Sequence, residues 1–193
     1  MPVTIKVDRL GDVKRAIELL ASTRVLVGYP SDAEQPHQGR GKIGANERKV
    51  KAQEIAQGKS SARPPMTNAV LGYIHENGAP EVNLPARPHL VPGVRDVQGA
   101  IAGRLRDAAE QGLAGNLAGV EKNFIAAGLV AQSSVRRKIT EGIPPPLAPS
   151  TVRNRIRAHP SRRAKTAEDM TALIDTGQLR QAVSFVLRKG VQK

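Results

Sequence analysis

Two long stretches of helical periodicity constrain the fold of this chain more than any other feature. In the first, apolar residues recur every three or four positions, which predicts a helix from about Gly93 to Gln111. The second stripe runs from Leu117 to Ile139, and Gly142 with the prolines that follow it predicts where this helix ends. These helices are the largest predicted elements, so we expect the remaining structure to pack against them.

Shorter elements are predicted on both sides of the two long helices. Alternating or continuous apolar runs predict three strands, at residues 3–7, 24–28 and 183–187. Apolar stripes with capping residues predict shorter helices, which cover residues 12–21, 67–76 and 150–157, and a helical turn at residues 166–173. Four prolines between residues 79 and 92 predict a rigid loop there.

Length and composition limit how these elements combine. With 193 residues the chain has room for one ordinary domain or two small ones, and we favour a single core spanning residues 1–193. Aromatic residues make up only 2% of the chain, so Ala, Val, Ile and Leu must build that core. We therefore predict an α+β domain in which a small mixed or antiparallel sheet packs against the two long helices, with a basic loop inserted at residues 31–65.

Positive charge is the strongest chemical signal in the sequence. Lys and Arg number 30 against 17 Asp and Glu, which gives a net charge of +13 and makes polyanions the first expected neighbours. The charge gathers in two segments, the predicted flexible arm at residues 31–65 and a second run at residues 153–165. The candidate residues for contact with DNA or a partner are Arg40, Lys42, Arg48, Lys49, Lys51, Arg153, Arg155, Arg157, Arg162 and Arg163.

Two interpretations of these basic segments remain open. Either they form a solvated surface that keeps the protein in solution, or they contact phosphates. With so few aromatic side chains to stack on bases, phosphate contact would not read sequence and would weaken as salt rises.

No apolar run approaches the roughly 18 residues that cross a bilayer, and no secretion signal is visible at the N-terminus. We therefore expect no membrane partner.

The sequence offers little for catalysis, metals or cofactors. Cysteine is absent, and the four histidines are scattered without the spacing of a metal site. Residues 39–44 match G-x-G-x-x-G, but they follow a polar, proline-containing segment instead of a strand, so we interpret them as a flexible loop. No serine lies in a nucleophile elbow. We predict no enzyme activity, no cofactor and no metal.

Three separate segments carry a family resemblance. The first is His75-Glu-Asn-Gly78 with Leu84-Pro-Ala-Arg-Pro-His-Leu90, the second is Pro146-Leu-Ala-Pro-Ser-Thr-Val152, and the third is Leu173-Ile-Asp-Thr-Gly-Gln-Leu179. In order and spacing they resemble the neck and tail-completion proteins of long-tailed bacteriophages and prophages, a family also labelled virion morphogenesis or putative tail component. Asn77 and His89 depart from this family pattern, which usually has aromatic residues at these two positions.

The resemblance implies a structural virion protein at the junction of head and tail. Such a protein is a subunit of a ring, of six-fold or twelve-fold symmetry, around the channel through which DNA passes. Its implied neighbours are connector, terminator or tail-tube proteins, with non-specific contact to packaged DNA, and its implied location is the virion, after assembly in the cytoplasm of the bacterial host. The alternative from another class is a free, sequence-independent nucleic-acid-binding protein.

Within the resembling segments we select four candidate residues for a subunit interface, namely Glu76, Arg87, Pro88 and Asp175. Two prolines flank Arg87 at close range and reduce the entropy of its loop, so its planar guanidinium is held in a fixed pose. That group can bond to an adjacent copy or to its own chain, and the sequence leaves both alternatives open. Asp175-Thr-Gly177 is more simply a capped turn in which glycine permits a positive φ.

Overall fold

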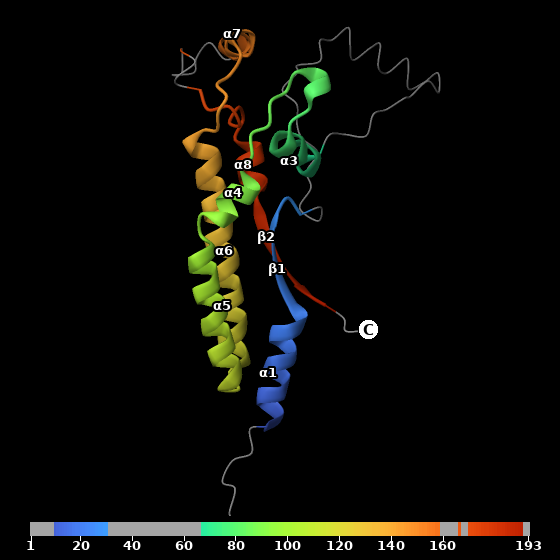
Figure 1. Cartoon of the computed structure of the whole chain (residues 1–193), viewed down its shortest axis with the longest axis vertical. Coiled ribbons are helices and arrows are strands. Elements are labelled where there is room, and N and C mark those ends of the chain that lie inside the picture. Colours follow the sequence, from blue (N-terminus) through green and yellow to red (C-terminus); the bar gives the residue numbers. More distant parts are fainter. Residues whose placement is uncertain (1–9, 31–66, 159–165, 167–169, 191–193) are drawn as a thin grey trace, which may run out of the picture.

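The computed structural model describes residues 10–30, 67–158, 166 and 170–190, and in them the chain forms the expected α+β fold. Its two longest helices, α5 (Gln98–Leu113) and α6 (Leu117–Glu141), lie side by side along the molecule (Figure 1). A two-stranded antiparallel sheet packs against α6. The predicted strand at residues 3–7, the arm at residues 31–65 and residues 159–165 lie outside the described residues.

The tight connection between α5 and α6 follows from two residues. Gly115 adopts a positive φ of 74°, which a residue with a side chain rarely accepts, and so ends the first helix. Asn116 then caps the second helix, because its side-chain oxygen accepts the backbone N–H of Gly119 at 3.0 Å. The chain thereby reverses within three residues, and the two helices run antiparallel.

The first long helix predicted from the sequence is in fact two helices. The chain forms α4 (Leu90–Arg95), breaks at residues 96 and 97, and continues as α5. Gly93 brings α4 very close to α6, since a Cβ at this glycine would lie 2.8 Å from the Cα of Val135. Asp96, at the break, bonds to Nζ of Lys138 on α6 at 2.9 Å. These tertiary contacts hold a break that the apolar periodicity does not reveal.

The sheet pairs β1 (Thr23–Gly28) with β2 (Ser184–Lys189), so the predicted strands at residues 24–28 and 183–187 are confirmed. Alternate residues face α6, and their cross-strand pairs are Val25 with Leu187 and Val27 with Phe185. Gly128 on α6 leaves the space that the ring of Phe185 occupies. The sheet therefore has one face covered by the long helix.

Three shorter helices lie close to their predicted positions, namely α1 (Leu10–Ser22), α3 (Asn68–Asn77) and α7 (Pro149–Ala158). The structure adds two elements that were not predicted, the 3-10 turn η2 (Pro80–Val82), inside the stretch predicted as a rigid loop, and α8 (Gln178–Ala182). Thr67 caps α3 as expected, because its hydroxyl accepts the N–H of Val70 at 3.2 Å. The helical turn predicted at residues 166–173 is not formed in its described part, where residues 172 and 173 make an ordinary turn.

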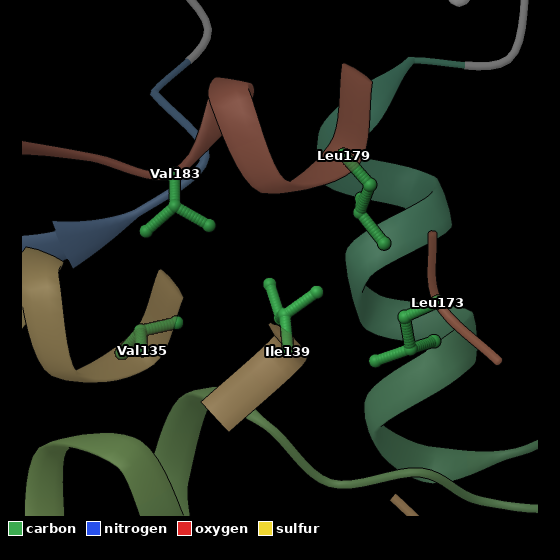
Figure 2. Packing of buried hydrophobic residues seen from close by; sticks show 5 residues of the cluster. All are labelled: Val135, Ile139, Leu173, Leu179 and Val183. Atoms are coloured by element: carbon green, nitrogen blue, oxygen red, sulfur yellow. The ribbon is translucent and has the colours of Figure 1, made fainter. Parts of the chain in front are cut away.

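The core divides into two clusters along α6. Near one end of α6, Val120 and Phe124 pack with Ala108 of α5 and with partly buried residues of α1 and the sheet. Near its other end, Val135 and Ile139 pack with three residues from the C-terminal part of the chain, Leu173, Leu179 and Val183 (Figure 2). The second cluster anchors the loops that surround the C-terminal end of α6, and these loops contain the candidate site.

Candidate functional site

The three segments that carry the family resemblance meet at the C-terminal end of α6. We call this region the loop cluster, and define it as residues 75–90, 143–152 and 171–179. Buried contacts connect it to the core, because Leu173 and Leu179 pack on Ile139 while Leu90 and Ile143 cover the same cluster. Hydrogen bonds from Arg87 join the first segment to the second, and Arg155 of α7, just beyond the second segment, bonds to the third.

Glu76, near the end of α3, holds the start of α4. Its carboxylate accepts the backbone N–H groups of His89, Leu90 and Val91 at 2.7, 2.8 and 3.0 Å. These are orphan donors at a helix N-terminus, where negative charge is favourable. Burial alone would raise the pKa of Glu76, but the three backbone hydrogen bonds and the neighbouring His89 outweigh burial and hold the pKa below its ordinary value of 4.5.

His89 connects the start of α4, which Glu76 caps, to the sheet. Its side chain is fully buried, and its Nε2 lies 2.7 Å from the hydroxyl of Tyr29, at the end of β1. Its Nδ1 lies 3.1 Å from the carbonyl oxygen of Arg87 and 3.2 Å from the carboxylate of Glu76. Burial, with a further contribution from the charge of Glu76, raises the pKa of the Tyr29 hydroxyl above its ordinary value.

Arg87 bonds within its own chain. Its side chain is only 5% exposed, and the guanidinium donates from Nε and Nη2 to the carbonyl oxygen of Pro145, at 3.2 and 3.0 Å. A third bond, from Nη2 to the carbonyl oxygen of Pro146, measures 3.3 Å. Of the two alternatives left open by the sequence, these contacts match the intramolecular one. Pro88, beside Arg87, is exposed.

Arg155 has a similar role on α7. Its guanidinium donates to the carbonyl oxygens of Thr171 and Ile174, both at 3.1 Å, and to that of Ala172 at 3.0 Å. The neighbouring candidates Arg153 and Arg157 are exposed. Positions two apart on a helix point to nearly opposite sides, so Arg155 faces the loop cluster while the other two face solvent. Contact of these three arginines with DNA or a partner stays a prediction, and at Arg155 the guanidinium is already bonded within its own chain.

Asp175 lies in the turn that precedes α8. The turn has the predicted form, because the hydroxyl of Thr176 accepts the N–H of Gln178 at 3.1 Å and Gly177 has a φ of 80°. Asp175 and Arg155 line the same depression of about 150 Å³, together with His75 of α3. The structure therefore places Asp175 in the loop cluster, at a depression that it shares with Arg155 and His75.

The remaining candidates lie outside the described residues. They are Arg40, Lys42, Arg48, Lys49 and Lys51 of the arm, and Arg162 and Arg163 of the second basic run. The prediction that these residues face DNA or a partner remains a prediction.

Sequence reasoning missed a third arginine of the same kind, Arg136 on α6. Its Nη2 donates to the carbonyl oxygens of Val183 and Gln181, at 2.8 and 3.2 Å, and so fixes the connection between α8 and β2. Arg87, Arg136 and Arg155 together show that part of the basic composition stabilises loops through backbone carbonyls.

Comparisons with known proteins identify no relative. No protein-family model, no curated protein and no solved structure matches the chain. Within the described ranges, no three His, Asp or Glu side chains gather in a way that could hold a metal ion. No helix in the described part of the chain is long and apolar enough to cross a membrane.

Proposed function

We propose that this chain is a structural virion protein at the head-to-tail junction of a long-tailed bacteriophage, where it forms a ring around the DNA channel. One observation carries the proposal. The three segments that resemble the family's elements are far apart in sequence, yet Arg87 joins the first to the loop before the second, and Arg155 joins α7 to the third. One structural unit therefore accounts for the resemblance in all three places.

The loop cluster is suited to subunit contacts. Its buried bonds fix loops that would otherwise cost entropy to order on assembly. Several large apolar side chains around it stay exposed, among them Tyr73 and Val82, each at 71%, and Val91 at 55%. A closed ring needs a heterologous interface, in which such a surface meets a different surface of the next copy. Six-fold or twelve-fold symmetry and neighbouring connector, terminator or tail-tube proteins belong to this proposal.

Positive charge agrees with a position around DNA. Arg153 and Arg157 lie four positions apart on α7, so they share one exposed side of this helix. They can contact phosphates without reading bases. The same observation favours the second candidate function, a sequence-independent nucleic-acid-binding protein. In that case Arg153→Glu with Arg157→Glu should abolish binding to random duplex DNA, and the affinity of the wild type should fall steeply as salt rises.

Complementation of defective particles tests the proposal. Cells that assemble the phage without this protein should accumulate filled heads and separate tails, and addition of the purified chain should join them into infectious particles. Val82→Asp, at an exposed position of the loop cluster, should fold normally and fail to restore joining. Ala100→Asp, at an exposed position of α5, is the matched control and should restore it. Infectious particles formed without the protein would refute the proposal.

A further inference from the structure

The face of the sheet that points away from α6 has an unusual composition. Three cross-strand pairs form rows on it, and these are Gly28 with Ser184, Leu26 with Val186, and Arg24 with Arg188. The middle row is apolar, and Leu26 is 44% exposed. The outer row places two exposed guanidinium groups directly opposite each other. Like charges in this arrangement destabilise a sheet, so the pair does not contribute to folding stability.

The two arginines lack a partner in the part of the chain that the structure describes. No carboxylate there pairs with either of them, whereas Lys189 on the opposite face bonds to Glu121 of α6 at 2.9 Å. Two exposed cations without a carboxylate partner among the described residues favour an anionic occupant on this face.

A hollow on this face lies beside Arg188. It has a volume of about 220 Å³, and its lining includes the apolar residues Leu26, Val186, Tyr29 and Pro30. Gly28 and Ser184, the small residues of the first row, also line it. The apolar residues of this lining, next to a charged pair, favour a polypeptide over a nucleic acid, because a phosphate backbone has no large apolar group to place among them.

The row spacing defines what the occupant must present. Neighbouring rows are two residues apart, which is about 6.6 Å along a strand, and the same distance separates residues i and i+2 of any extended segment. We infer that this face binds an extended, acidic segment of a partner protein, in which a large apolar residue enters the hollow and a carboxylate two positions away bridges Arg24 and Arg188. This inference goes beyond the proposed function and does not depend on it.

Fluorescence anisotropy with a labelled peptide, Thr-Thr-Leu-Thr-Glu-Thr-Thr, tests the inference on the full chain. We expect saturable binding below about 1 mM, with the affinity reduced at least tenfold by Arg24→Glu or Arg188→Glu. Arg106→Glu, an exposed arginine of α5, is the control for net charge and should change affinity less than twofold. Circular dichroism confirms that each variant folds.

Two control peptides test the inference further, and binding to random duplex DNA and self-association of the chain test the alternative occupants. A peptide with lysine in place of glutamate, or with glutamate moved next to leucine, should bind at least tenfold more weakly, since either change removes the carboxylate from the arginine row. Equal binding of these peptides, or unchanged binding by Arg188→Glu, would overturn the inference. Absence of peptide binding would also overturn it. In that case, loss of random-duplex binding in Arg188→Glu would indicate nucleic acid as the occupant, and loss of self-association would indicate a second copy.

Discussion

Removal of the Glu76 carboxylate should destabilise the protein more than any other loss of a single carboxylate among the described residues. This group satisfies three backbone donors at the start of α4, and two of its bonds, to His89 and Leu90, are partly buried. Loss of a hydrogen bond to a charged group costs about 1.5–3 kcal/mol when the remaining partner stays buried, and loss of an exposed bond such as that of Val91 costs less. We therefore expect Glu76→Ala to lower the free energy of unfolding by about 3 kcal/mol.

Urea unfolding followed by circular dichroism measures this effect. Glu110→Ala, at an exposed position of α5, is the control and should change the free energy of unfolding by less than about 0.5 kcal/mol. Glu76→Gln keeps one acceptor oxygen and loses the charge, so we expect an intermediate loss of about 1.5 kcal/mol. A loss below about 0.5 kcal/mol for Glu76→Ala would refute the account of the α4 cap.

The pH dependence supplies an independent check on Glu76. Its pKa is lowered in the folded protein, so the folded state favours the ionised carboxylate, and this stabilisation is fully present above the unfolded value near 4.5. It is lost as pH falls below 4.5 and through the lower folded pKa. The stability difference between wild type and Glu76→Gln should therefore shrink below pH 4.5. Parallel pH curves for the two proteins would contradict the assignment.

Three further substitutions test other parts of the structure. Arg87→Lys should cost about 2 kcal/mol in urea unfolding, because an ammonium cannot reproduce the planar fork that binds the two proline carbonyls. Gly128→Ala should cost about 1–3 kcal/mol through overpacking against β2, whereas Gly103→Ala, which has open space around it, should gain about 0.5–1 kcal/mol. Arg24→Glu should raise the thermal midpoint, because it replaces a like-charge pair with an ion pair to Arg188.

Local pattern accounts for most of the secondary structure. The apolar stripe from Leu117 to Ile139 predicts α6 almost completely, and Gly142 ends it as expected. The break at residues 96 and 97 escaped prediction because the apolar spacing continues through it, while the contacts that hold it come from α6. Periodicity records which face of a helix is buried, but it does not record a change in helix direction.

The candidate site was only partly predictable. Glu76 and Arg87 were selected from the family resemblance, but their partners are backbone groups that only the fold brings close. His89 takes a position where the family usually has an aromatic residue, and its ring still packs edge-on against Tyr29, with centroids 6.0 Å apart. Tyr29 precedes His89 by 60 residues, so no local pattern indicated the hydrogen bond between them.

The role of each basic residue also depends on the fold, as it does for Glu76 and Arg87. A charge count treats Arg153 and Arg155 alike, but the first is exposed and the second binds three backbone carbonyls. Composition therefore overestimates the charge that is free to meet a polyanion.

Electron cryomicroscopy of the assembled phage, with symmetry assigned at the junction of head and tail, tests the central proposal most directly. The account predicts density for the antiparallel α5–α6 pair, repeated six or twelve times around the DNA channel, with the loop cluster against the next copy. Complete maps of infectious virions in which this chain occupies no position would contradict it.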